Sequence, residues 1–142
     1  MARRRARALT AVVLLAAVVL GGCTRTTEGG ADVDVANRAG QELASPSGAH
    51  TASLQPAGED GGVPMLAVVV TGADGEEVFR SDGTYSTRHG VAIAWQHDGE
   101  ALWVLSADVG TSRVESDGGQ WTQTWLTPQT RDDVPPEIDA LR

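Results

Sequence analysis

The sequence of 142 residues contains no lysine and only one cysteine, Cys23. The missing lysine excludes a phosphate-loop lysine, a Schiff-base lysine and a serine–lysine dyad. A single cysteine cannot form an intramolecular disulfide in any compartment. The folded part of the chain must therefore be held together by burial of apolar side chains.

Familiar catalytic and metal-binding motifs are absent as well. The histidines, His50, His89 and His97, form no His-Glu-x-x-His pattern, and there is no Gly-x-Ser-x-Gly nucleophile elbow. We therefore assign no catalytic, cofactor-binding or metal-ligating residue. A pair of catalytic carboxylates stays open, because nineteen acids offer many pairs whose distance in space the sequence does not fix.

Positive charge is scarce and unevenly placed. All eleven basic residues are arginine, and four of them lie in the first seven residues. From Cys23 onward seven arginines face nineteen acids, a formal net charge of −12. Nucleic acid is excluded as a partner, since its binding needs a basic face that neutralises phosphates. Such acidity favours a soluble, monomeric protein, or else an acidic interaction face.

The start of the chain has the order of a signal peptide. Arg3, Arg4, Arg5 and Arg7 precede an apolar run, Ala8 to Leu20, in which Thr10 is the only polar residue. Thirteen residues are too few for a membrane-spanning helix, which needs roughly 20.

The residues Leu20-Gly21-Gly22-Cys23 resemble the lipobox of bacterial lipoproteins. The resemblance covers residues 1–23 and implies cleavage before Cys23 and a diacylglycerol on its thiol. Two acyl chains suffice for a stable anchor. A lipidated thiol would serve neither catalysis nor metal binding. The alternatives are an uncleaved membrane helix and an ordinary secretory signal.

The segment after Cys23 predicts a tether. Residues 24–44 are small and polar, and as a flexible coil they would hold a domain on the order of 25 Å from the bilayer. A short helix over residues 34–44 is the alternative. Asp32 and Asp34 are interpreted as solvated linker acids rather than a metal pair.

Residues 45–128 predict an all-β domain, a single antiparallel β-meander or small sandwich of about six to eight strands. Met65 to Thr71 is expected to be a central strand buried on both faces. The hairpin from Val91 to Leu105 also has apolar residues on both sides, which indicates the middle of a sheet or sandwich. Acids that precede glycine should bond the backbone of their turns. Asp74, Asp82, Asp98 and Asp117 are four such acids.

Two turns resemble each other at a distance of 51 residues. They are Ser45-Pro46-Ser47-Gly48 and Gln96-His97-Asp98-Gly99, and each is followed by a strand. Each resembles the turn and strand of a propeller blade, but a propeller needs at least four blades and this chain has room for about two. Residues 45–105 are also similar to small envelope proteins with no well-established activity. That likeness implies the fold and leaves function open.

Trp121 and Trp125 are four residues apart and share a strand face, so they are the candidate binding face. Trp95 and Trp103 are expected to face one another across their hairpin and to pack in the core. The acidic C-terminal tail, residues 129–142, frays unless Ile138 and Leu141 dock one helical turn that begins at Pro136.

The sequence therefore predicts a lipid-anchored protein of the cell membrane, facing away from the cytoplasm, whose β-domain is a non-enzymatic binding or interaction module. Its partners would be the membrane, through the lipid on Cys23, and an unidentified envelope protein or glycan. The alternative is an exported carboxylate-dependent hydrolase acting on envelope glycans. A third possibility is a subunit whose edge strand completes a larger assembly.

Overall fold

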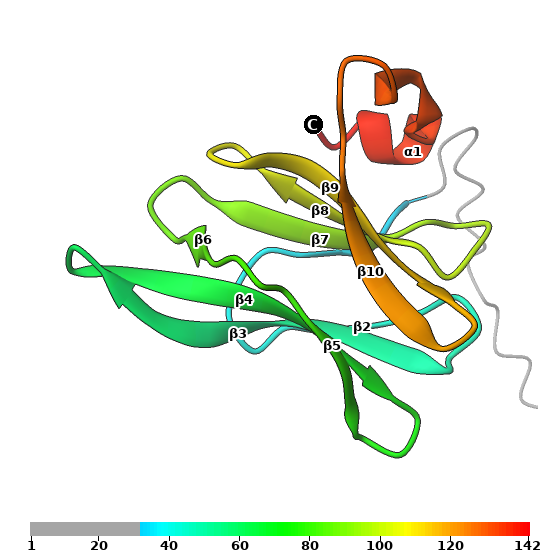
Figure 1. The fold of residues 1–142 in the computed structure, drawn as a ribbon, viewed down its shortest axis with the longest axis horizontal. Helices are drawn as coiled ribbons and strands as arrows, with labels where there is room; N and C mark the ends of the chain where they lie inside the picture. Colours follow the sequence, from blue (N-terminus) through cyan, green and yellow to red (C-terminus); the bar gives the residue numbers. More distant parts are fainter. Residues whose placement is uncertain (1–31) are drawn as a thin grey trace, which may run out of the picture.

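The structure is a computed structural model that describes residues 32–142. Two antiparallel sheets pack face to face, and a short C-terminal segment lies against the outside of one of them (Figure 1). The predicted all-β fold is confirmed, and it takes the form of a sandwich. No helix in residues 32–142 is long and apolar enough to cross a membrane.

The first sheet has five strands, β1 (Val35–Ala36), β7 (Val91–Trp95), β8 (Leu102–Ser106), β9 (Gly110–Asp117) and β10 (Gln120–Trp125). They pair in the order β1-β7-β8-β9-β10, so the last four form a meander. The β9–β10 turn needs glycine at both central positions, because Gly118 and Gly119 have φ angles of 58° and 87°.

The second sheet also has five strands, β2 (Glu42–Ala44), β3 (His50–Asp60), β4 (Val63–Gly72), β5 (Glu77–Arg80) and β6 (Tyr85–Ser86). Its first four strands form a meander in the order β2-β3-β4-β5, and β6 pairs with β4. The two sheets thus repeat one arrangement, four consecutive strands that each turn back beside the previous one. The likeness between the turns at Ser45 and Gln96 reflects this repeat, since they join the first two strands of the two meanders.

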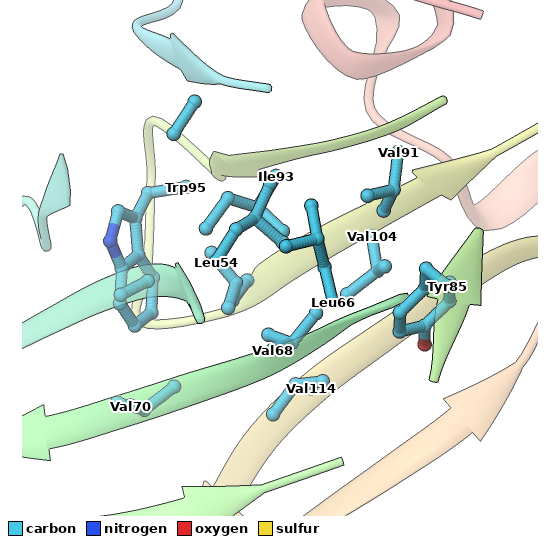
Figure 2. Packing of buried hydrophobic residues seen from close by; sticks show 13 residues of the cluster. Leu54, Leu66, Val68, Val70, Tyr85, Val91, Ile93, Trp95, Val104 and Val114 are labelled. Atoms are coloured by element: carbon cyan, nitrogen blue, oxygen red, sulfur yellow. The ribbon is translucent and has the colours of Figure 1, made fainter. Parts of the chain in front are cut away.

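The core lies between the sheets and is made mainly of aliphatic side chains, with Tyr85 and Trp95 among them (Figure 2). Alternate residues of β4, Leu66, Val68 and Val70, face the alternate residues Val91, Ile93 and Trp95 of β7 within this cluster. Ala67 and Val69, on the opposite side of β4, are also buried. The valine-rich strand is therefore covered on both faces, as its unbroken apolar run predicts.

A second apolar cluster covers the outer face of the first sheet. Ala94 of β7 and Trp103 of β8 pack there against Val134 and Ile138, which follow β10. The expected contact between Trp95 and Trp103 is wrong, because Trp95 pairs with Leu102 and belongs to the inner core, on the other face of the sheet. Ile138 is fully buried in α1 (Pro136–Asp139), a single helical turn preceded by the 3-10 turn η1 (Arg131–Asp133). The C-terminal tail thus belongs to the domain, which explains why the β7–β8 hairpin is apolar on both sides.

The domain begins earlier than the sequence predicts. Residues 35–44, assigned to the tether or to a short helix, contain β1 and β2 instead, and these strands extend the two sheets. Ala36 is completely buried and Leu43 packs on the core. Strands of two and three residues show no alternation of their own and depend on their neighbours. A tether can therefore reach no further than residue 34.

The strand directions place four turns at one end of the sandwich, the end where residues 32–34 join it (Figure 1). We call this the turn end. Its turns span residues 45–49, 73–76, 96–101 and 118–119. Asp74 accepts a bond from the Glu76 N–H at 3.1 Å, as expected of a turn acid. Within residues 32–142, Asp82, Asp98 and Asp117 make no such bond. At the Asp82 turn the hydroxyl of Ser81 donates instead to the carbonyl of Gly83 at 2.7 Å.

Candidate functional site

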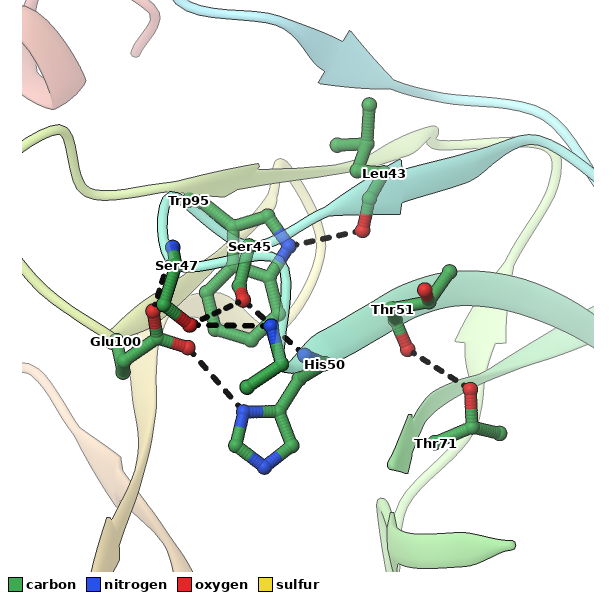
Figure 3. A network of polar contacts seen from close by, with 9 residues as sticks. Leu43, Ser45, Ser47, His50, Thr51, Thr71, Trp95 and Glu100 are labelled. Atoms are coloured by element: carbon green, nitrogen blue, oxygen red, sulfur yellow. Dashed lines mark hydrogen bonds and ion pairs between the residues drawn. The ribbon is translucent and has the colours of Figure 1, made fainter. Parts of the chain in front are cut away.

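The most organised polar cluster joins the two sheets at the turn end (Figure 3). Glu100, in the β7–β8 turn, accepts the backbone N–H of Ser47 at 2.9 Å, and its other oxygen lies 3.2 Å from Nδ1 of His50. Ser47 and His50 belong to the β2–β3 turn and the start of β3, on the opposite sheet. The carboxylate therefore bridges the equivalent turns of the two meanders.

Glu100 is held in its charged form by this arrangement. Partial burial on its own would raise the pKa, but hydrogen bonds from Ser47, Ser45 and His50 outweigh that effect and lower the pKa of Glu100 to about 2. A carboxylate with so low a pKa is a poor general acid at neutral pH. Its chemistry here is to accept hydrogen bonds and orient the imidazole of His50.

His50 is also fixed by an aromatic neighbour. Its ring meets the indole of Trp121 edge to face, with 4.9 Å between ring centroids and 79° between the planes. The carboxylate of Glu100 favours a proton on Nδ1, which leaves Nε2 as the basic nitrogen.

The arrangement is not a serine–histidine–acid triad, although all three residue types are present. The hydroxyls of Ser45 and Ser47 accept bonds from the backbone N–H groups of His50 and Ala49, at 3.2 and 3.1 Å. Figure 3 shows both hydroxyls near the backbone of His50, with the imidazole ring pointing away from them. A triad would need a serine hydroxyl on Nε2. The hydroxyls therefore shape the turn.

The predicted tryptophan pair is not an open aromatic face. Trp121 is partly buried against the sandwich core and His50, whereas Trp125 is 42% exposed at the end of β10. Between them, Gln123 points inward and donates to the Tyr85 hydroxyl at 2.8 Å and to the Ser112 hydroxyl at 2.7 Å. The inner face of β10 is thus committed to the core over most of its length.

A hollow lies at the opposite end of the sandwich, beside the C-terminal segment. Its volume is about 410 Å³, within the range of small-ligand sites. Its lining includes the apolar residues Val91 and Leu105 and the polar residues Asn37, His89 and Arg142. No sequence pattern indicates this hollow, because it exists only where the C-terminus folds back on the first sheet.

The acids near the start of the described chain border a second hollow, of about 290 Å³. Asp32 and Asp34 lie there with His97 of the β7–β8 turn, and both acids are exposed. Within residues 32–142 no group of three or more histidine, cysteine, aspartate or glutamate side chains is placed to hold a metal ion. The interpretation of Asp32 and Asp34 as solvated linker acids stays a prediction.

The pairing of His50 with Glu100 was missed because 50 residues separate the two. One signal could have found it, namely the similarity of the turns at Ser45 and Gln96, since equivalent turns of two stacked meanders lie at the same end. The predicted lipidation site, Cys23, lies outside the described residues.

Comparisons with protein families, with curated proteins and with solved structures found no match for this chain.

Proposed function

We propose that this protein is a lipid-anchored component of the cell envelope whose β-sandwich binds a partner without catalysing a reaction. The observation that carries the proposal is the basic and apolar signal that ends in Leu20-Gly21-Gly22-Cys23. A diacylglycerol on Cys23 would place the sandwich at the outer face of the membrane.

The position of β1 makes the proposed tether short. About eleven residues separate Cys23 from Val35, and a coil of that length spans on the order of 18 Å. Since the chain joins the sandwich at its turn end, that end would face the membrane. Its acids, which include Asp74, Asp98 and Asp117, would be repelled by anionic lipid and would keep the domain off the surface.

The hollow beside the C-terminus supports a binding role, because it lies at the end turned away from the anchor. Its lining combines apolar residues with His89 and Arg142, a mixture suited to a partner with both apolar and hydrogen-bonding groups. Leu141, which is 38% exposed, forms part of the same surface.

The alternative of a glycan hydrolase gains no support from the described residues. Such enzymes place two carboxylates on opposite sides of the scissile bond. Asp32 and Asp34 line the hollow of about 290 Å³ together, but they are only two positions apart in one segment of the chain. Glu100, the most perturbed carboxyl, is already occupied by Ser47 and His50.

Intact mass spectrometry of the protein from its native membrane, together with Cys23→Ser, tests the anchor. We expect a chain that starts at Cys23 and is heavier by a diacylglycerol, and we expect Cys23→Ser to leave the membrane fraction. An unmodified chain, or a serine variant that still fractionates with membranes, would show that the anchor assignment is wrong.

Site-specific photocrosslinking in native membranes tests the binding role. A photoreactive residue at position 141 should give a discrete crosslinked product. The matched control is position 78, because Val78 is 40% exposed but lies near the turn end. Equal labelling from both positions, or none from position 141, would contradict a binding surface at the hollow.

A further inference from the structure

The sandwich has one long strand edge that lacks the usual protection against pairing with another chain. Natural edges are kept short, or carry charge or proline. Here β1 and β2 have two and three residues, and β5 carries Glu77 and Arg80. By contrast β10, at the edge of the first sheet, has six residues and no charge or proline.

The backbone of β10 offers open hydrogen-bonding groups at this edge. Leu126 donates to Thr111 at 2.9 Å, which fixes the even-numbered residues of the strand as those that bond to β9. The N–H and C=O groups of Trp121, Gln123 and Trp125 therefore point to the free edge. β5 runs close by on the other sheet, but within residues 32–142 no backbone hydrogen bond joins it to β10.

The sequence of this edge reads the same in both directions. Trp121-Thr122-Gln123-Thr124-Trp125 is a palindrome centred on Gln123. A two-fold axis through Gln123 would set a second copy antiparallel, with each Trp121 opposite Trp125 and each Thr122 opposite Thr124. Residues 121, 123 and 125 carry the outward backbone groups. The Trp121–Trp125 pairs and the Gln123–Gln123 pair would therefore each exchange two backbone hydrogen bonds.

We propose that β10 is a self-association edge, at which two copies of this chain pair antiparallel about Gln123 to form one continuous sheet. The two-fold symmetry of the sequence about Gln123 points to a second copy as the occupant. Residues from Cys23 onward carry a net charge of −12, which opposes association over most of the surface, but β10 has no acid, so two copies can meet there without opposing like charges. Tryptophan and threonine pairs across strands are themselves stabilising.

The test places charges on Thr122 and Thr124, which are exposed and face away from the core. In the proposed register the double variant Thr122→Glu/Thr124→Glu places two glutamates opposite each other at two positions. We expect it to raise the dimer dissociation constant about tenfold or more. The variant Thr122→Glu/Thr124→Lys opposes unlike charges twice and should restore the wild-type dimer. Sedimentation equilibrium of the full chain in density-matched detergent measures both.

A crosslinking experiment fixes the register independently. Threonines 122 and 124 of opposite copies would form a non-hydrogen-bonded pair, with Cα atoms about 4.5 Å apart, which a disulfide can bridge. Differently tagged Thr122→Cys and Thr124→Cys chains, expressed together, should crosslink to each other much more than either does to itself.

Thermal unfolding of each variant shows whether the fold is kept. A wild-type chain that is monomeric at all accessible concentrations would overturn the proposal. A double-glutamate variant that dimerises as well as wild type would do the same. Pairing of β10 with a strand of a different protein would appear as a monomer in the purified sample, and so also counts against self-association.

Discussion

The carboxylate of Glu100 lies 3.2 Å from Nδ1 of His50, and the two residues come from opposite sheets. A second bond, from the backbone of Ser47, ties the same carboxylate to the β2–β3 turn. Away from the hydrophobic core, these contacts give the sheets a directional link. Apolar packing alone is not directional, so these hydrogen bonds define how the two sheets are aligned at the turn end.

Replacing Glu100 by glutamine should destabilise the protein in a way that depends on pH. The pKa of Glu100 is about 2 in the folded protein against an ordinary value of 4.5, so its charged form stabilises the fold above pH 4.5. That contribution is lost as the pH falls through 2. Because the side chain of Glu100 is about one-third exposed, solvent screens its interactions. We expect Glu100→Gln to lower the free energy of unfolding by about 1 kcal/mol at pH 7, well below the full linkage value.

Thermal unfolding of wild type and Glu100→Gln at pH 7, 4 and 2 measures this effect. The difference in stability should be largest at pH 7 and should shrink at pH 2. Glu59→Gln is the control, because Glu59 is exposed in the β3–β4 hairpin. A difference that is the same at all three pH values would show that the charge of Glu100 does not matter.

The hydrogen bonds of Gln123 should contribute more to the free energy of unfolding than those of an exposed residue. Gln123→Ala leaves the hydroxyls of Tyr85 and Ser112 without their donor, and both residues are almost completely buried. We expect a loss of about 2 kcal/mol in urea unfolding. Tyr85→Phe in the Gln123→Ala background should cost less than in wild type, since the hydroxyl it removes is already unpaired. Additive effects of the two changes would contradict this coupling.

Docking of the C-terminal segment should depend on Ile138 and not on Leu141. Ile138 is fully buried against Trp103 and Ala94, so Ile138→Ala should cost about 2–4 kcal/mol. Leu141 is 38% exposed, and Leu141→Ala should change stability by less than about 0.5 kcal/mol. Chemical denaturation compares the two, and equal losses would mean that the segment is held by its last turn as a whole.

The fold class can be predicted from local patterns of apolar and polar residues along each strand. The alternation in the Val91 to Leu105 hairpin and the apolar run of β4 can both be recognised without knowing which strands lie beside them. β1 and β2 were missed because residues 35–36 and 42–44 are too short to show a period. The His50 and Glu100 contact was missed for another reason, since only the stacking of two meanders brings together residues so far apart.

Replacing each tryptophan of β10 by alanine should have different effects on the stability of the monomer. Trp121 packs on the core and on His50, so Trp121→Ala should destabilise the monomer by about 2–3 kcal/mol. Trp125 is 42% exposed, and its loss should cost the monomer less than about 1 kcal/mol. Trp125 would face Trp121 of a second copy, however, so Trp125→Ala should weaken self-association more than it weakens the fold. Unfolding at a dilution where the chain is monomeric, set beside sedimentation at higher concentration, separates the two effects. If Trp125→Ala lowers monomer stability as much as Trp121→Ala does, Trp125 belongs to the core and is not available to a partner.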